Sequence, residues 1–310
     1  MTKTLLTHKS FESSRHFLEA QARPLETALF RHFFDGASIT PVLEALTTYQ
    51  NPDGGFGHAL EPDLRAPESS ALCTSIAFQI LRSIHASPSE SLVKSGVAYL
   101  LTTLNRQTGH WQIISSTAGQ SPHAPWWDTT NREQEFASFS LNPTAELLGY
   151  LYDYIDDSHR EILLPLTERV LSYLAGQDKI VMHDLLCCLR LLRTESLPLE
   201  IRQPLGQKLA QLIDGVLTYD PSQWKDYGLR PLQVIDDPGS MFMPGREGAV
   251  ETNLDYEIST QNEDGSWSPN WTWGDLFPGV WPTACREWSG VITLDKLLIL
   301  KRFHRIEGIG

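Results

Sequence analysis

Three short segments of this 310-residue chain share one pattern, and the repetition constrains the fold more than any other feature. They are Gln50–Gly57, Asn105–Gln112 and Gln261–Ser268. Each begins with an amide side chain, has a glycine four positions later (Gly54, Gly109, Gly265) and an aromatic residue two positions after that (Phe56, Trp111, Trp267). The glycines are 55 and 156 residues apart, and 156 is three times 52. A unit of about 52 residues fits almost six times into the chain and is long enough for two helices and a loop.

Helical periodicity runs along most of the chain, whereas the alternation typical of strands is almost absent. A helix over residues 10–34 is expected to break at Pro24, and Pro41 suits the first position of the next helix. The dipeptide Asn142–Pro143 suits an N-cap followed by a first helical position. Further helices are expected at Ser69–His85, Ser89–Thr103, Ser158–Gly176, Met182–Thr194, Leu199–Leu217, Glu247–Thr260 and Trp288–Arg305. The sequence therefore predicts an all-α fold in which six helical hairpins form a ring, an (α/α)6 toroid, as a single domain over residues 1–310.

Charge and cysteine content narrow the partners and the compartment. The 25 basic and 38 acidic residues give a net charge of −13, which argues against nucleic acids and anionic membranes as partners. The four cysteines contain no C-x-x-C pair and are expected to be reduced thiols: Cys73, Cys187, Cys188 and Cys285. The N-terminal stretch is too polar for a signal peptide, and no apolar run reaches the ~18 residues that a membrane span needs. We expect a cytoplasmic protein without an integral membrane segment. The sequence does not indicate the oligomeric state.

The repeated residues resemble those of a known superfamily. Gln261, Gly265 and Trp267 match the so-called QW repeat of terpenoid cyclases and protein prenyltransferases, and Gln50, Gly54 and Phe56 match it less closely. The segments GGFGHALEPDLR and SWSPNWTWG are similar to those of bacterial proteins described as containing prenyltransferase/squalene-oxidase repeats. This resemblance implies an α/α toroid over the whole chain. The D-x-D-D and D-x-C motifs of the cyclases and prenyltransferases do not occur, so the resemblance identifies no catalytic residue.

The densest polar group lies between the first repeat and the helix expected at Ser69. His58, Glu61 and Asp63 are the predicted catalytic residues, because paired carboxylates beside a histidine suit general acid–base chemistry. Arg65 is predicted to bind substrate. The alternative is structural, with Glu61 and Asp63 capping helices or pairing with Arg65 at the surface.

Tryptophan is unusually frequent, with nine in the chain, and several lie in long helix-poor stretches. The stretches 51–68, 112–140, 220–246 and 262–286 are expected to be loops that open one end of a central cavity. The candidates for substrate binding in the last three are Trp126, Trp127, Asp128, Arg230, Asp236, Trp271 and Trp273. Aromatic faces stabilise positive charge and line apolar pockets, although single tryptophans also serve as ordinary core residues.

A possible metal site occurs on one predicted helix. His183 faces Cys187, and Asp184 faces Cys188, each pair at i and i+4. These residue types bind zinc, but a zinc site normally has three or four ligands at recognisable spacing, and the cysteines lie within an apolar run. We therefore predict no metal and no cofactor, with zinc at these four residues as the alternative.

Three functions remain open from the sequence. The leading one is a terpenoid-cyclase-like enzyme that protonates an apolar or isoprenoid-like small molecule in an aromatic-lined cavity. The second is a glycan-active α/α barrel, in which paired carboxylates act as acid and base and tryptophans stack on sugars. The third is a non-catalytic toroid that binds a partner through its loops.

Overall fold

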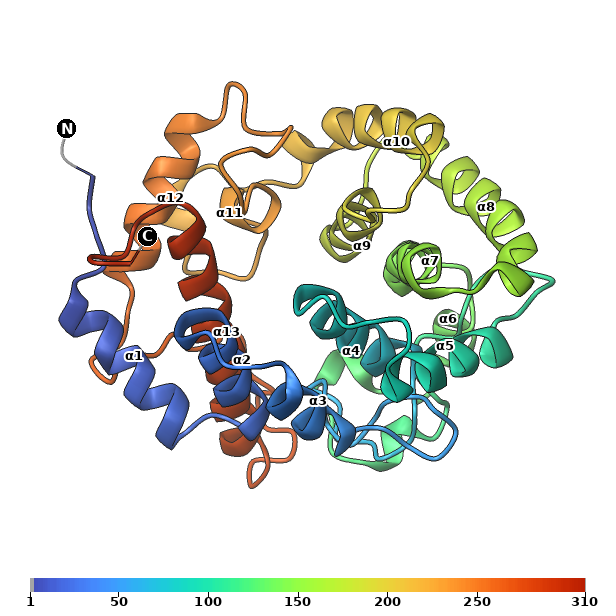
Figure 1. Cartoon of the computed structure of the whole chain (residues 1–310), viewed down its shortest axis with the longest axis horizontal. Coiled ribbons are helices and arrows are strands. Elements are labelled where there is room, and N and C mark those ends of the chain that lie inside the picture. The colour runs from blue at the N-terminus through green and yellow to red at the C-terminus, as the bar shows by residue number, and fades with distance from the viewer. Residues whose placement is uncertain (1–2, 310) are drawn as a thin grey trace. The chain divides into compact units, whose positions relative to one another are not determined.

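In the computed structural model, which describes residues 3–309, the regular secondary structure consists of helices. In this range the extended backbone forms isolated bridges rather than strands, which confirms the all-α class (Figure 1). None of the helices within residues 3–309 is long and apolar enough to cross a membrane. The chain divides into two compact units, which we call the first unit (Met1–Ala45 with Leu217–Gly310) and the second unit (Leu46–Val216).

The second unit is built from two layers of helices. Figure 1 shows α4 (Ala71–Ser83), α7 (Leu141–Tyr154) and α9 (Met182–Leu192) in one layer, with α5 (Ser91–Thr103), α8 (Leu163–Ala175) and α10 (Leu199–Leu212) in the other. The helix α7 packs against α4, α5, α8 and α9 and is buried almost along its whole length. Consecutive long helices thus alternate between the layers, which is the arrangement of stacked helical hairpins.

The first unit combines segments from both ends of the described chain. Its helices are α1 (His8–Ala20), α2 (Pro24–Asp35), α11 (Pro231–Val234), α12 (Glu247–Ser259) and α13 (Trp281–Arg302), and α3 (Thr40–Thr47) lies where the two units divide. The helix α13 packs against α1 and α2. The amide of Leu6 donates to the carbonyl of Arg305 at 2.8 Å, and the buried Arg305 side chain pairs with Glu251 and Asp255. The Leu6 bond holds the segment before α1 next to the residues that follow α13, and the Arg305 ion pairs join those residues to α12.

Two of the repeated segments make the same hydrogen bonds. The Nε2 of Gln50 donates to the carbonyls of Gly54 (2.9 Å) and of Leu92, in the first turn of α5 (3.2 Å). The Nε2 of Gln261 donates to the carbonyls of Gly265 (3.0 Å) and of Ser10, in the first turn of α1 (3.1 Å). Each glutamine therefore joins its own turn to the start of another helix.

The glycine in each repeat allows a turn that other residues would resist. The φ angles of Gly54, Gly109 and Gly265 are 89°, 67° and 86°, a left-handed conformation that glycine adopts without a steric penalty. A Cβ atom at Gly265 would lie 2.3 Å from the carbonyl carbon of Ser13, and one at Gly54 would lie 2.3 Å from the carbonyl oxygen of Ser95. At these two positions glycine also permits close approach of a neighbouring helix.

The aromatic residues of the repeats are buried. The indole nitrogens of Trp111 and Trp267 donate to the carbonyls of Leu100 (2.7 Å) and Glu257 (2.8 Å) in the preceding helices. The amides of Phe56 and Trp267 both donate to a threonine hydroxyl of the next long helix, at Thr74 and Thr293 (3.1 and 3.0 Å). The segments at Gln50 and Gln261 therefore join consecutive helices in closely similar ways, whereas the Asn105 segment shares only the left-handed glycine and the buried, hydrogen-bonded tryptophan.

Several predicted boundaries were wrong. The helix α13 begins at Trp281, seven residues before the predicted start, because Pro282 occupies a position in its first turn where proline is tolerated. Ser140 caps the first turn of α7, since its hydroxyl accepts from the amide of Asn142; Asn142 itself is non-helical, so the continuous part of α7 begins at Pro143, as predicted. The predicted helix Ser158–Gly176 is divided into a 3-10 turn, Asp157–Ile162, and α8. The expected loops also contain short helical turns, at Ala118–Gln120, Pro125–Trp127, Glu133–Phe136, Pro221–Gln223 and Pro231–Val234.

Candidate functional site

In the second unit, the loop that carries Glu61 and Asp63 is held against the segment that precedes the paired tryptophans. Leu64 and His123 form an antiparallel bridge. The amide of Arg65 donates to the carbonyl of Pro122 at 2.9 Å, and the amide of Ala124 donates to the carbonyl of Asp63 at 2.8 Å. The Glu61–Asp63 loop and the segment before Trp126, some 60 positions apart in the sequence, are thus joined by backbone hydrogen bonds.

Both carboxylates of this loop are buried. The exposed fractions of Glu61 and Asp63 are 7% and 2%, and both residues interact with other groups. Carboxylates are almost never buried without such interactions, because removing their charge from water is costly. The alternative prediction placed Glu61 and Asp63 at the surface. Their burial contradicts it, and only Arg65 is partly exposed.

His58 differs from the two carboxylates in its environment. It is exposed, and its Nε2 is 2.8 Å from the Oδ1 of Asn51. The backbone turns sharply here, because both His58 and Ala59 have positive φ angles (53° and 61°). Left-handed residues other than glycine cost energy, persist where the surroundings enforce them and are enriched at functional sites.

The aromatic segment after this bridge contains two different tryptophan environments. Trp126 is 38% exposed, whereas Trp127 is half-buried, with its ring 6.2 Å from that of Phe136. The indole nitrogen of Trp127 is buried and has no hydrogen-bond partner among the described residues. Asp128 is half-buried and accepts from the amide of Thr130 at 2.9 Å, and this backbone bond is the main reason that its pKa is lowered. Asp128 thus shapes its own turn.

A buried polar cluster on α4, α7 and α9 was not predicted from the sequence. Its centre is Glu146, only 2% exposed, which pairs with Arg190 at 3.1 Å. The same carboxylate oxygen accepts from Gln79 at 3.2 Å and from the hydroxyl of Tyr150 at 3.3 Å. A lone carboxylate within the otherwise apolar run of α7 is the sequence signal that could have indicated it.

The residues of the alternative zinc site are engaged otherwise. The Oδ1 of Asp184 accepts from the hydroxyl of Ser140 (3.2 Å) and the amide of Asn142 (3.0 Å), and the thiol of Cys187 donates to the side-chain oxygen of Asn142 (3.5 Å). Burial raises the pKa of the Cys187 thiol well above its ordinary value. Within residues 3–309 no group of three or more histidine, cysteine or acidic side chains is placed to hold a metal.

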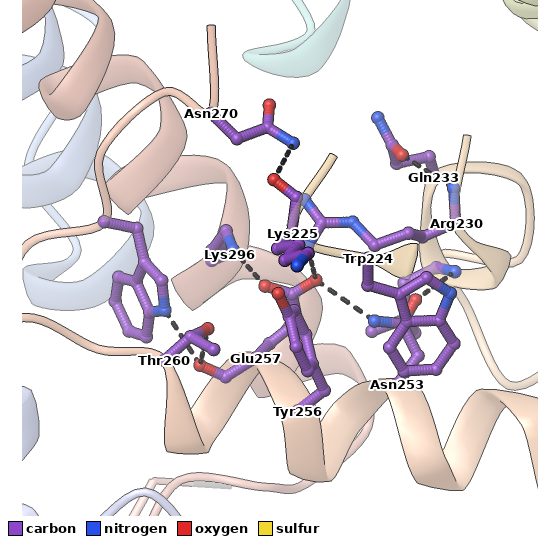
Figure 2. A network of polar contacts seen from close by, with 12 residues as sticks. Trp224, Lys225, Arg230, Gln233, Asn253, Tyr256, Glu257, Thr260, Asn270 and Lys296 are labelled. Atoms are coloured by element: carbon purple, nitrogen blue, oxygen red, sulfur yellow. Dashed lines mark hydrogen bonds and ion pairs between the residues drawn. The ribbon is translucent and has the colours of Figure 1, made fainter. Parts of the chain in front are cut away.

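The first unit has its own buried charged cluster, centred on Glu257. In Figure 2, Arg230, Lys296 and Asn253 converge on the Glu257 carboxylate, which is 3.2 Å from the Arg230 guanidinium and 3.1 Å from the Asn253 amide nitrogen. Asn253 also accepts from the amide of Leu232 at 3.1 Å and so fixes α11 on α12. Arg230 was predicted as a binding residue, but Glu257 and Lys296 were not.

The other candidates of the first unit lie in packed or paired environments. Asp236 forms an ion pair with Arg302 at 3.2 Å. Trp273 is buried, with its ring 5.6 Å from that of Trp281. Trp271 is half-buried and makes edge-to-face contacts with Tyr227 and Trp288, at centroid distances of 5.7 and 5.1 Å. Trp271 is therefore the more accessible of the two predicted tryptophans.

Comparison with known proteins adds no relative. The chain matches no protein family model, and no curated protein is significantly similar to it in sequence. The function must therefore be inferred from the geometry and chemistry of the sites themselves.

Proposed function

We propose that this protein is an enzyme that acts on an apolar or isoprenoid-like small molecule through acid–base chemistry by Glu61 and Asp63. The observation that carries the proposal is the hydrogen-bonded junction of their loop with the segment leading to Trp126 and Trp127. Buried carboxylates can divide the roles of acid and base between them, and aromatic faces stabilise developing positive charge.

The proposed fold is the (α/α)6 toroid of the terpenoid cyclase and prenyltransferase superfamily. The matching hydrogen bonds of the Gln50 and Gln261 segments support it, as does the alternation of helices between two layers in the second unit. In such a fold the loop after a repeat leads into an inner helix, and the Glu61 loop precedes α4 in this way. We place the enzyme in the cytoplasm because its four cysteines are free thiols.

A glycan substrate is the second candidate, and the exposure of Trp126 favours it. An accessible indole face offers an apolar platform for stacking, whereas a tryptophan that lines a closed apolar cavity would be shielded from water. Paired carboxylates are also the usual equipment for glycoside hydrolysis. The substrate class therefore decides between the two proposals.

A ligand panel tests the proposal. We would measure thermal unfolding with prenyl diphosphates, neutral polyprenes and oligosaccharides, and then analyse products for any class that raises the unfolding temperature. We expect stabilisation by one isoprenoid class, followed by turnover. Stabilisation by oligosaccharides alone would support the glycan enzyme, and no stabilisation by any isoprenoid would contradict the proposed substrate class.

Variants of the carboxylates test the assignment once a substrate turns over. Asp63→Asn and Glu61→Gln keep side-chain size but remove the ionisable group, and loss of a general acid or base lowers the rate by about 10²- to 10⁴-fold. Asp156→Asn is the matched control, because Asp156 is an exposed cap of a 3-10 turn in the same unit. Full turnover by both test variants would exclude Glu61 and Asp63 as the acid and base.

A further inference from the structure

The first unit contains a small cavity beside its buried charged cluster. The cavity has a volume of about 170 Å³, and its lining includes Thr218, Gln223, Trp224, Asp226, Tyr227 and Arg230. The lining segment is closed on itself, because the amide of Thr218 donates to the carbonyl of Leu229 at 2.8 Å. Trp224 is buried, and its indole nitrogen donates to the carbonyl of Thr218 at 2.6 Å. These contacts hold the wall of the cavity in place.

Positive charge exceeds negative charge in the adjoining cluster. Among the described residues, Glu257 is the one carboxylate paired with Arg230 and also the one paired with Lys296, so two cations share one anion. All three side chains are at most 18% exposed. The rings of Tyr256 and Trp267 lie 5.6 and 5.7 Å from the cations and offset part of the excess. A buried net charge remains unfavourable until an anion compensates it.

Arg230 connects this excess charge to the cavity. Its Nη1 is paired with Glu257, while the same side chain forms part of the cavity wall. A guanidinium has five N–H donors, so one ion pair leaves donors that can bind an oxyanion. Burial lowers the pKa of Lys296, and Arg230 lowers it further against the opposing effect of Glu257, which is consistent with an excess of positive charge at this point.

We propose that this cavity binds a small carboxylate against Arg230, with the excess charge of the Arg230–Glu257–Lys296 cluster as its electrostatic basis. One negative charge balances the cluster. Asp226 in the same wall is exposed, so solvent screens its charge from the buried cluster, but it still repels a phosphate dianion more than a singly charged carboxylate. The site lies in the first unit, so it does not depend on the activity proposed for Glu61 and Asp63.

The test uses the full-length protein with acetate, glycine and inorganic phosphate as probes, at ionic strength matched with sodium chloride. We would measure line broadening of ¹³C-labelled acetate by NMR, and competition by the other two. We expect saturable acetate binding that phosphate displaces poorly. Displacement by glycine that is stronger than by unlabelled acetate would support an ammonium contact with Asp226 in addition. Acetate binding that chloride abolishes, or preferential binding of phosphate, would overturn the proposal.

Two variants separate the roles of contact and charge. Arg230→Gln leaves Glu257 paired with Lys296 and the cluster neutral, and loss of this charged hydrogen-bond donor should weaken acetate binding about 10- to 100-fold. Lys296→Met does not alter the cavity wall but also neutralises the cluster, so it should weaken binding several-fold. Arg302→Gln, at an exposed ion pair of the same unit, is the control and should bind as the unmodified protein does. Unchanged binding by Arg230→Gln would refute the site, and unchanged binding by Lys296→Met would refute its electrostatic basis.

Discussion

Substitution of Gly265 by alanine tests whether the repeated segments hold the fold together. An alanine there would have to keep a φ of 86°, and left-handed backbone costs about 1–2 kcal/mol for residues with a Cβ. Its Cβ would lie 2.3 Å from the carbonyl carbon of Ser13, where ordinary contacts begin at 3.4 Å, so α1 would have to move by about 1.1 Å. Overpacking of this kind costs about 1–3 kcal/mol. Allowing about 0.4–1 kcal/mol for the stiffer unfolded chain, we expect Gly265→Ala to destabilise by about 1–4.5 kcal/mol.

Two matched glycines separate the contributions. At Gly109 the φ is 67°, but the nearest atom to a new Cβ is the Cγ of the flexible Arg169 side chain at 3.3 Å, so Gly109→Ala should cost only the backbone energy less the same unfolded-chain allowance, up to about 1.5 kcal/mol. Gly248 lies in α12 with nothing within 4 Å of a new Cβ, and its φ is not left-handed. Gly248→Ala should therefore stabilise by up to about 1 kcal/mol, because alanine favours helices.

Urea unfolding followed by far-UV circular dichroism measures these differences. Changes in the midpoint at constant m-value report stability, and the m-value also shows whether the two units still unfold together. We expect the order Gly248→Ala, unmodified protein, Gly109→Ala and Gly265→Ala from most to least stable. If Gly265→Ala were no less stable than Gly109→Ala, the close approach of α1 would not matter and the reasoning would fail.

Two further predictions concern pH and a buried hydrogen bond. Partial desolvation, and to a smaller extent Arg190, lowers the pKa of His183, so the folded protein binds fewer protons there than the unfolded chain and loses stability as pH falls below 6.5; the loss is small because the residue reaches solvent. His183→Gln should therefore reduce the fall in unfolding midpoint between pH 6.5 and 5, and an unchanged pH profile would contradict this. Trp267→Phe removes a 2.8 Å hydrogen bond to the carbonyl of Glu257 and should lower the free energy of unfolding in urea by about 1–3 kcal/mol. The control Trp126→Phe, at an exposed ring, should change it by no more than about 0.5 kcal/mol. Equal effects of the two substitutions would refute the importance of the buried bond.

Secondary structure was predictable where local signals agree. The start of α9 at Met182 and the break at Pro24 follow from periodicity and proline. The start of α13 was missed because Pro282 was interpreted as part of a loop, whereas proline in a first helical turn removes no hydrogen bond. At the start of α7 the sequence indicated Asn142 but not the additional cap at Ser140, where Asp184 of another helix accepts from the hydroxyl of Ser140 and the amide of Asn142.

The buried charged clusters could not be predicted in the same way. Glu257 meets Lys296 from a different helix, 39 positions away, and Glu146 meets Arg190 from 44 positions away. Periodicity indicates which face of a helix is buried but not which residue of another helix lies opposite. The loop acids Glu61 and Asp63 could be chosen as candidates from the sequence, because they lie with His58 and Arg65 within eight positions. Such a local concentration of polar residues is visible without knowledge of the fold.

The residues that stabilise the first repeat differ from those to which we assign chemistry. Gln50, Gly54 and Phe56 form their hydrogen bonds inside the protein, with helices α4 and α5, and the corresponding residues after α12 do likewise. Glu61 and Asp63 stand five and seven positions beyond Phe56. At the same distances beyond Trp111 and Trp267 the chain has Ser116, Ala118, Thr272 and Gly274, none of them acidic. The acids are thus additions to one copy of a repeat whose other copies stabilise the fold without them. For this reason we expect Glu61→Gln and Asp63→Asn to keep the repeat contacts and to report on chemistry.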